Sequence, residues 1–473
     1  MRFRILFPAF AVASLVGCLG NTGDSQPPPS DVTPVAGDGI AGITWTPQLG
    51  ISYLAFGATN PNLTTTNWTD LNIAGFAILN NGTNTTPPAL VCNAAQGFAA
   101  NGQPYYFTVD AHTGTAPGGP GSPTMQATPR AAGGLLPNGS NSWKRNPTAI
   151  GAAANALAYT TVTTCLPNAL PTGVLTAVGP AGAIYSSTDN GNSWTSRTPA
   201  GFTANLNAVG SYTAFVNNPL TPGMLIVAVG DGGTSIRSLD GITWTPTATA
   251  VTVNGTPVTF RAISVAIANF IAVGDGGQAF ASLDGVNWTA QTTNTTANLH
   301  AIDCVGATCV AVGDAGVVDL TYDGGITWTV TTLGGGTSAL RAVAYGNFDN
   351  NLTGTDVNGF PVIGVANNAL INTWLVAGDA GSAFQSTTVV SGTATTWTAA
   401  SVPVSNTTNL VALSYTTQFV AIDNGGNAYT SQTAAAGTWS AAIPSGITDP
   451  VALATNGHGY VLAGSSGDDT ESF

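Results

Sequence analysis

The sequence predicts an all-β fold assembled from repeated units, and three observations lead to this prediction. Apolar residues alternate at two-residue spacing in many short runs, which places alternate side chains on one face of a strand. Glycine-rich turns separate the runs, and nothing in the chain reads as a long amphipathic helix. The stretch from Ile271 to Thr289, I-A-V-G-D-G-G-Q-A-F-A-S-L-D-G-V-N-W-T, recurs in recognisable copies over most of the 473 residues.

Each copy of this stretch predicts two hairpins that are closed by different turns. The first turn is Gly274-Asp275-Gly276-Gly277, in which glycine accepts positive φ and the aspartate hydrogen-bonds its own turn. The second turn runs from Ser282 to Trp288. Its serine and aspartate offer short side-chain acceptors to turn N–H groups, and its tryptophan anchors the next strand.

The second turn resembles the Asp-box (BNR) repeat of sialidase-like and photosystem II assembly-factor-like β-propellers, S-x-D-(x)-G-x-x-W. Full-length copies run from Ser187 to Trp194 and from Thr321 to Trp328, and shorter copies run from Ser238 to Trp244 and from Ser282 to Trp288. In that family the box is a structural turn, remote from any active site. The resemblance therefore implies a structural role for Asp189, Trp194, Asp240, Trp244, Asp284, Trp288, Asp323 and Trp328.

The spacing of the repeats predicts a β-propeller of four-stranded blades. The tryptophans that end successive units, from Trp143 to Trp328, lie 51, 50, 44 and 40 residues apart by subtraction, a period typical of such blades. Seven unit endings, at positions 143, 194, 244, 288, 328, 397 and 439, plus one split closing unit favour eight blades. Seven or nine are also compatible with the irregular first hundred residues.

The two ends of the chain predict how the ring closes. Ala41 to Pro47 reads as the end of a repeat without its beginning, and Val451 to Gly467 reads as a beginning without its end. An N-terminal strand that completes the last blade would leave no long exposed edge. We therefore expect one propeller domain over residues 41–467 and a polar tail over residues 468–473.

The N-terminus resembles that of a bacterial lipoprotein. Arg2 and Arg4 precede a short apolar run, and Leu15-Val16-Gly17-Cys18 resembles a lipobox, which implies a signal peptide over residues 1–17 and lipidation of Cys18. Leu19 after the cysteine, by analogy with enterobacterial lipoproteins, favours the outer membrane of the cell envelope, with the protein periplasmic or surface-exposed. Residues 18–40 then form a polar, proline-rich tether.

Composition and cysteine spacing limit the classes of partner, disulfide and cofactor that we expect. Only 7% of the residues are charged and the net charge is −13, so a basic patch for nucleic acid is not expected. Cys304 and Cys309 flank a turn between two strands and could form a disulfide, or stay buried thiols. Cys92 and Cys165 could form a second pair. No cysteine or histidine spacing predicts a metal or cofactor site.

Two sets of residues are expected at the mouth of the central channel. The first is the turn aspartate of successive blades, which could form a partial acidic ring or only close its own hairpin: Asp231, Asp275, Asp314, Asp379 and Asp423. The second is the polar position of the inner-strand signature, where valines also occur at 411 and 451: Asn207, Arg261, His300 and Arg341. In photosystem II assembly-factor-like propellers, L-R-A-V repeats help to build a basic partner-binding patch. Only two arginines hold that position here, and both could simply pair with the turn aspartates.

The residues argue against a sialidase-like hydrolase. Such enzymes use an arginine triad, a tyrosine activated by glutamate and an aspartate acid/base, whereas the only glutamate here is Glu471. Phe260-Arg261-Ala262-Ile263 lacks the proline of the F/Y-R-I-P motif and is one repeat among several. We therefore expect a non-enzymatic envelope lipoprotein that acts as a protein-binding or assembly platform. The alternative is a sialidase-like carbohydrate-active enzyme or glycan-binding propeller.

Overall fold

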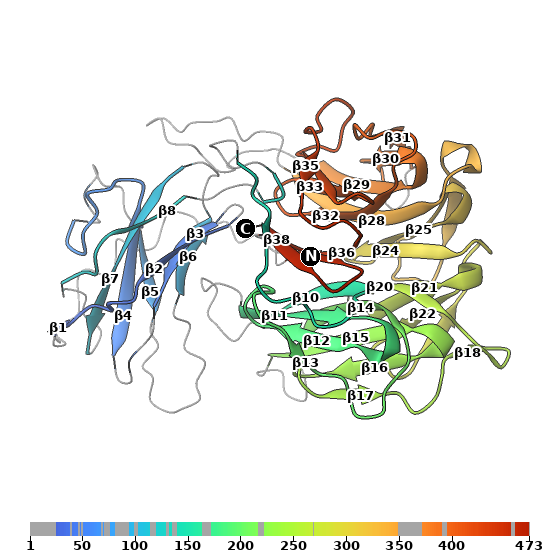
Figure 1. Cartoon of the computed structure of the whole chain (residues 1–473), viewed down its shortest axis with the longest axis horizontal. Helices are drawn as coiled ribbons and strands as arrows, with labels where there is room; N and C mark the ends of the chain where they lie inside the picture. The colour runs from blue at the N-terminus through green and yellow to red at the C-terminus, as the bar shows by residue number, and fades with distance from the viewer. Residues whose placement is uncertain are drawn as a thin grey trace. The chain divides into compact units, whose positions relative to one another are not determined.

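The computed structural model divides the chain into two compact units (Figure 1). Unit 1 comprises residues 1–131 and 163–171, and unit 2 comprises residues 132–162 and 172–473. The structure describes residues 25–37, 40–45, 48, 51–67, 70, 76–80, 94–98, 103–113, 120–128, 132–134, 140–162, 172–215, 222–267, 269–348, 371–389, 395–455 and 459–472. Within these residues, no helix has the length and apolar character needed to cross a membrane.

Unit 1 consists of two antiparallel sheets. The larger sheet has the order β1-β7-β4-β5, with β8 paired to β7. The smaller sheet has the order β2-β3-β6. The strands are β1 (Ser25–Gln26), β2 (Thr33–Gly37), β3 (Ile40–Thr44), β4 (Ser52–Ala58), β5 (Phe76–Asn80), β6 (Ala94–Phe98), β7 (Tyr105–His112) and β8 (Met125–Ala127). Side chains of both sheets share one core that includes Ile43, Tyr53 and Phe107.

The described residues of unit 2 form a β-propeller of seven four-stranded antiparallel sheets, which are numbered here as blades 1 to 7 in chain order. Blades 1 to 3 contain β10 (Ala156–Val162), β11 (Thr172–Val178), β12 (Ile184–Ser187) and β13 (Thr195–Ser196); β14 (Leu206–Phe215), β15 (Pro222–Gly230), β16 (Ser235–Ser238) and β17 (Trp244–Pro246); and β20 (Phe260–Ala266), β21 (Asn269–Gly274), β22 (Ala279–Ser282) and β23 (Thr289–Gln291). A small hairpin of β18 (Thr252–Val253) and β19 (Thr256–Pro257) lies between blades 2 and 3 in the chain.

The next three blades have the same order of strands. They contain β24 (Leu299–Val305), β25 (Thr308–Gly313), β26 (Val317–Thr321) and β27 (Thr329–Thr332); β28 (Leu340–Phe348), β29 (Ile371–Gly378), β30 (Ala383–Ser386) and β31 (Thr398–Ala399); and β32 (Leu410–Tyr415), β33 (Phe419–Asp423), β34 (Asn427–Ser431) and β35 (Ile443–Pro444). Blade 7 contains β36 (Pro450–Thr455), β37 (Tyr460–Gly464), β38 (Asp469–Ser472) and, as its outermost strand, β9 (Lys144–Arg145).

The first strand of each blade is the innermost one, and these seven strands close a ring. Each inner strand contacts the inner strand of the next blade, and β36 of blade 7 contacts β10 of blade 1. One buried apolar cluster fills the space between each pair of neighbouring blades. Alternate side chains of a strand therefore face two different neighbours, which explains why the middle strands read as unbroken apolar runs such as F-I-A-V-G.

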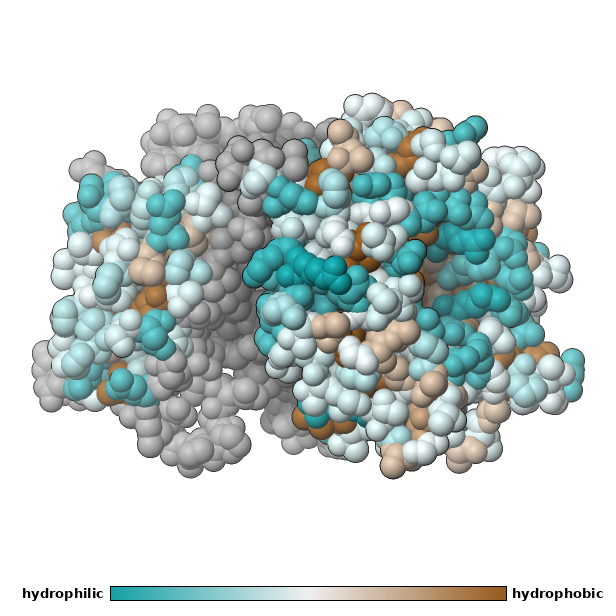
Figure 2. Space-filling model, viewed as in Figure 1, coloured by the Kyte–Doolittle hydropathy of each residue, from teal (hydrophilic) through white to brown (hydrophobic). Residues whose placement is uncertain are grey.

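Blade 7 closes the ring with segments from both ends of unit 2. β9 pairs with β38, and Trp143, immediately before β9, packs beside Tyr460 and Leu462 of blade 7. Two ion pairs lie at this junction, Lys144 with Glu471 and Arg145 with Asp468. The hydrophilic band over β38 in Figure 2 lies at the position of this junction in Figure 1.

The closure explains why the count of eight blades exceeds the seven that are present. Trp143 was counted as the end of a first complete unit, but it is the end of the split unit that residues 450–472 begin, so the same blade was counted twice. An N-terminal segment does complete the last blade. That segment is β9, whereas residues 41–44 of the expected stretch Ala41 to Pro47 belong to β3 of unit 1.

Three predicted boundaries also differ from the structure. The propeller does not begin at residue 41, because the described residues before Ala131 belong to unit 1. The predicted tether includes β2 (Thr33–Gly37), which is paired along its length with β3. The predicted polar tail is strand β38, in which Asp469, Thr470 and Ser472 are buried. Polar composition suggested exposed ends, but these residues hydrogen-bond within a sheet.

Candidate functional site

The turn between the second and third strands of each blade and the beginning of its inner strand lie on the same face of the propeller. In blade 3, for example, Phe260 at the beginning of β20 lies opposite Gly274 at the end of β21, and the next residue is the turn residue Asp275. A Cβ atom on Gly274 would lie 2.0 Å from the carbonyl oxygen of Thr259, so glycine is required there. This face, with its inner-strand and turn residues, is called the channel mouth below.

Four consecutive blades place a donor of the inner strand against the turn aspartate of the same blade. Nδ2 of Asn207 donates to Oδ1 of Asp231 at 2.7 Å in blade 2. In blade 5, Nε and Nη2 of Arg341 donate to Oδ1 and Oδ2 of Asp379 at 3.1 and 2.9 Å. The pairs in blades 3 and 4 are Arg261 with Asp275, and His300 with Asp314, whose Nε2 and Oδ1 atoms lie 2.6 Å apart.

The structure therefore brings together eight of the nine predicted mouth residues, as four intra-blade pairs. Both arginine side chains remain 40% exposed although they are paired. The hydrogen bond from His300 lowers the pKa of Asp314, burial opposes the shift, and the charge of Arg341 on the next blade lowers that pKa further. The pKa of Arg341 is raised, because its guanidinium hydrogen-bonds Asp379 and also experiences the charge of Asp314. The pairs of blades 4 and 5 are thus electrostatically coupled.

Asparagines just before the inner strands join neighbouring turns, a role that the sequence analysis missed. Nδ2 of Asn298 donates to Oδ2 of Asp314, while its Oδ1 accepts the N–H of Gly276 from the preceding blade, both at 2.9 Å. Asn205 makes the same two types of bond, to Asp231 and from Ala181. The recurring letters N-L-N-A and N-L-H-A at 205–208 and 298–301 were the available signal.

The structure corrects the register of one predicted mouth residue and adds another. Asp423 lies opposite Leu410, where other blades have glycine, and it is buried. Its Oδ1 accepts the N–H groups of Gly425 and Asn427, so it closes its own turn, and Asn424 takes the mouth position. In blade 1, Asn155 occupies the position of Asn207, because its Nδ2 likewise donates to the first inner-strand carbonyl of the next blade.

The donor–aspartate pairs therefore lie on one side of the mouth, which is called the charged side below. Blades 2 to 5 carry the four pairs, whereas blades 6, 7 and 1 present Val411, Val451 and Asn155 at the inner-strand position, and Asp449 lies just before the inner strand of blade 7. The β18–β19 hairpin is fixed beside the charged side, because the carbonyl of Gly233 in the Asp231 turn accepts the N–H of Val251, and the N–H of Gly233 donates to the carbonyl of Val258. The hairpin projects at the edge of the blades in Figure 1, and its turn residues Asn254 and Gly255 are exposed.

The four predicted Asp boxes lie on the opposite face and are closed by their own side chains. In blade 3, Oγ of Ser282 accepts the N–H of Gly285 at 2.9 Å, and Oδ1 of Asp284 accepts the N–H groups of Val286 and Asn287. Burial alone would raise the pKa of Asp284, but these hydrogen bonds outweigh it and hold the pKa below the ordinary value. The aspartates at 189, 240 and 323 show the same balance.

The box tryptophans pack against neighbouring apolar side chains. Trp244 and Trp328 are buried, and Trp194 and Trp288 are partly buried against the clusters of their blades. These contacts place the predicted Asp-box residues in a scaffold.

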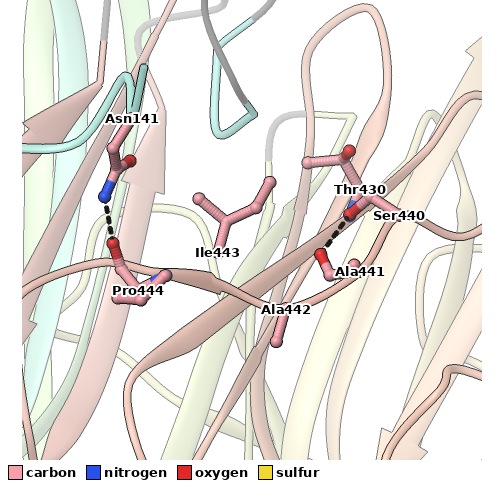
Figure 3. Close-up of a pocket in the computed structure, with 7 residues that line it drawn as sticks. All are labelled: Asn141, Thr430, Ser440, Ala441, Ala442, Ile443 and Pro444. Atoms are coloured by element: carbon pink, nitrogen blue, oxygen red, sulfur yellow. Dashed lines mark hydrogen bonds between the residues drawn. The ribbon is translucent and has the colours of Figure 1, made fainter. Parts of the chain in front are cut away.

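Other candidate sites add little chemistry. Cys304 and Cys309 form a disulfide across the β24–β25 hairpin, whereas Cys18, Cys92 and Cys165 lie outside the described residues. In the described part of the chain, no three His, Cys, Asp or Glu residues are grouped to hold a metal ion. A cavity of about 260 Å³ on blade 6 is lined by Asn141, Thr430, Ser440 and residues 441–444 (Figure 3). No charged residue and no mouth residue lines this cavity.

Comparisons with known proteins give similarity to solved structures only. No protein-family model and no curated protein matches the chain. A structure of YCF48 bound to D1 peptide is 15% identical over 72% of this chain and 97% of that chain, with a TM-score of 0.49. YCF48 from Cyanidioschyzon merolae is 14% identical over 70% and 98%, with a TM-score of 0.49. The WD40 β-propeller domain of Doa1 is 9% identical over 69% and 94%, with a TM-score of 0.43. The seven sheets establish the propeller by themselves, and these similarities carry no argument about function.

Proposed function

We propose that the protein is a non-enzymatic binding or assembly platform that binds a partner protein at the charged side of the channel mouth. The observation that carries the proposal is the set of four donor–aspartate pairs on blades 2 to 5. If these pairs served only to close their own hairpins, their charged atoms would not need to face the solvent. Here both arginines are exposed at the rim of a rigid ring.

The energetics of exposed ion pairs favour such a role. A solvent-exposed pair stabilises a fold by only about 0 to 1 kcal/mol, so exchanging an intramolecular carboxylate for one of the partner's has a small free-energy cost. The pairing also holds each long side chain in one place, which reduces the entropy lost on binding. Arg261 and Arg341 would bind carboxylates of the partner. Asp231, which accepts hydrogen bonds from the neutral side chains of Asn205 and Asn207, would bind a cation of the partner.

The chain's N-terminal sequence supports a location for the platform. We propose that the lipidated Cys18 anchors the protein in the bacterial cell envelope, with the outer membrane favoured, as the lipobox-like residues suggest. A lipid anchor would hold the mouth at a membrane surface and raise its effective concentration toward partners there. Labelling with a radioactive or alkyne-tagged fatty acid tests this step, and Cys18→Ser is expected to abolish incorporation.

Chemical cross-linking in the native envelope tests the binding site. Arg261→Glu with Arg341→Glu is expected to lower recovery of the cross-linked partner about ten-fold, as charge reversal removes attraction and adds repulsion. Arg197→Glu is the matched control, because Arg197 follows the outermost strand of blade 1, a blade outside the four donor–aspartate pairs, and its Nε donates to Oγ of Ser186. Equal recovery from all three proteins would show that the channel mouth is not the binding site.

The enzymatic alternative has a separate test. A screen with fluorogenic sialosides and other glycosides is expected to show no turnover. Turnover that Arg261→Ala or Arg341→Ala abolishes would overturn the platform proposal.

A further inference from the structure

The face opposite the channel mouth carries a concentration of exposed apolar side chains. Among the described residues, every large apolar side chain that is exposed lies on blades 2, 3 and 4. Five of them occupy Asp-box turns, Ile267 lies in the β20–β21 turn at the same face, and Val330 lies on β27, the outermost strand of blade 4: Leu239, Ile242, Ile267, Leu283, Val286, Ile326 and Val330. We call these seven residues the box-face patch. Exposed fractions of 67% for Leu283 and 72% for Ile326 show that neither contributes to the core.

Blade 1 shows that the Asp-box turn does not need these side chains. Its box, S-T-D-N-G-N-S-W, carries Thr188 where blades 2 and 3 carry leucine, and Asn192 where blades 2 to 4 carry isoleucine or valine. The same hydroxyl and carboxylate bonds close the turn of blade 1, including Gly191 N–H to Oγ of Ser187 at 2.8 Å. The turn therefore folds with polar residues at these two positions, and the apolar ones on blades 2 to 4 require another explanation.

The patch is held rigidly across blade boundaries. Oγ of Ser235 on blade 2 donates to the carbonyl of Gly285 in the box of blade 3, and Nη1 of Arg237 donates to that of Asp284, at 2.7 and 2.9 Å. The hydroxyl of Tyr212 donates to the carbonyl of Leu283. Ile267 N–H donates to the carbonyl of Gly306 on blade 4 at 2.9 Å. Apolar groups fixed in this way lose little conformational entropy when a partner covers them.

The charges around the box-face patch determine which kinds of partner can bind to it. Asp240, Asp284 and Asp323 are interleaved with the apolar residues, and their lowered pKa values keep them ionised. Arg237 is the cation of blades 2 to 4 nearest to these turns, and it is half-buried and bonded to the chain. Anionic lipid headgroups would be repelled, and a second copy of this chain, with its net charge of −13, would meet like charge with like charge.

We infer that the box-face patch is a second protein-binding surface, whose occupant presents apolar side chains flanked by lysine or arginine. Its leucines, isoleucines and valines bury against the patch, while its cations lie beside the three box aspartates. Exposed apolar side chains that gather on one part of a soluble protein mark such interfaces. This surface lies on the face opposite the channel mouth and does not depend on it.

The test uses the full chain and two synthetic probes. One is a short amphipathic peptide of leucine and lysine that carries a central photo-reactive group, and the other has glutamate in place of each lysine. The variant Leu239→Thr, Ile242→Asn, Leu283→Thr, Val286→Asn, Ile326→Asn gives blades 2 to 4 the residues of blade 1. Fluorescence anisotropy is expected to show an affinity for the lysine peptide about ten-fold weaker in this variant, with an unchanged thermal unfolding midpoint.

The location of the cross-links and a matched control complete the test. The lysine peptide is expected to cross-link at residues 239–242, 283–286 and 326–330, and Arg261→Glu with Arg341→Glu is expected to leave its affinity unchanged. Equal affinity of the variant, cross-links scattered over the acidic surface, or equal binding of the glutamate peptide would overturn the inference. So would patch-dependent binding to vesicles of phosphatidylglycerol and phosphatidylcholine, or patch-dependent dimerisation, because each identifies a different occupant.

Discussion

The hydroxyl of Ser472 accepts the N–H of Gly133 at 2.9 Å, which joins residues 339 positions apart across the junction of blade 7. This bond reproduces the bond between Ser238 and Gly241 inside the continuous box of blade 2. Trp143, the closing tryptophan, donates its indole N–H to the carbonyl of Gly133 and stacks beside Tyr460. Blade 7 therefore has a box-like turn assembled from two distant parts of the chain.

The first prediction concerns this split turn. Trp143→Ala is expected to lower the free energy of unfolding by about 3 to 5 kcal/mol, because it removes a large buried side chain from the ring closure. Ser472→Ala is expected to lower it by about 1 to 2 kcal/mol through loss of a buried hydrogen bond. Urea unfolding of the full chain measures both. Ser196→Ala, an exposed serine of β13, is the control, and losses no larger than its loss would contradict a structural role for the turn.

The second prediction concerns Asp319, which is fully buried in β26 without a hydrogen bond of normal geometry to either oxygen. Burial raises its pKa to about 6, and the nearby N–H groups of Asn294 and Leu320 offset only part of the shift. Because the folded state binds the proton of Asp319 more tightly than the unfolded chain does, protonation stabilises the fold. This stabilisation is fully present below the unfolded value of 3.8 and is lost as pH rises through about 6.

Asp319→Asn mimics the protonated carboxyl at every pH. It is expected to raise the free energy of unfolding near neutral pH by an amount on the order of 3 kcal/mol, and to flatten its dependence between about pH 4 and pH 6. Burial also raises the pKa of Asp469 to about 6, so the titration of Asp469 would leave part of the pH dependence of the unfolding free energy in place. Urea unfolding across this range measures the effect, with exposed Asp449→Asn as the control. An unchanged slope would show that Asp319 does not titrate in this window.

The third prediction concerns stability at acid pH, to which we expect the aspartates of the predicted Asp boxes to contribute. Their lowered pKa values give stability that is present above the unfolded value of 3.8 and lost as pH falls through the lower folded values. Asp284→Ala is expected to destabilise the protein by about 1 to 3 kcal/mol at neutral pH, since the N–H groups of Val286 and Asn287 lose their acceptor. The difference from wild type should shrink below about pH 3.5. A difference that is constant with pH would point to lost packing instead.

The fourth prediction concerns the disulfide of blade 4. Cys304 and Cys309 close a short loop, five residues apart in sequence, so replacing both with serine is expected to lower the free energy of unfolding by about 2 kcal/mol. The two positions lie directly opposite each other on β24 and β25, and the strand pairing continues beyond them. The variant should therefore keep its fold and its lysine-peptide affinity. Differential scanning calorimetry with and without reductant separates the effect of the bond from that of the serines.

The sequence predicts the local units better than their assembly. Alternating apolar residues and the repeated turns identify the strands of blades 1 to 6, because both signals depend on neighbouring residues. The partner of Trp143 depends on residues more than 300 positions away, so no local pattern assigns it to blade 7. Unit 1 was missed for a related reason, since strand-forming runs at Ser52–Ala58 and Tyr105–His112 do not reveal which sheet they join.

The channel mouth shows the same limit at the level of single residues. Arg261, His300 and Arg341 follow one spacing and were aligned correctly. Asp423 was placed one residue out of register, because I-D-N-G-G resembles V-G-D-G-G although its aspartate replaces the glycine. The register of such a turn is determined by its hydrogen-bond partners, which the structure shows and the sequence alone does not.

The junction of blade 7 has a mechanical consequence. Two residue pairs join β9 to β38, supported by the backbone bonds of Asn146 to Asp469 and of Ile150 to Gly467. Every other blade is drawn from one continuous stretch of chain, so tension applied between residue 140 and residue 472 acts on this junction before any other. A pulling experiment on the propeller would therefore open the ring at β9, and the rupture force of this short strand sets the load that the closed ring can bear.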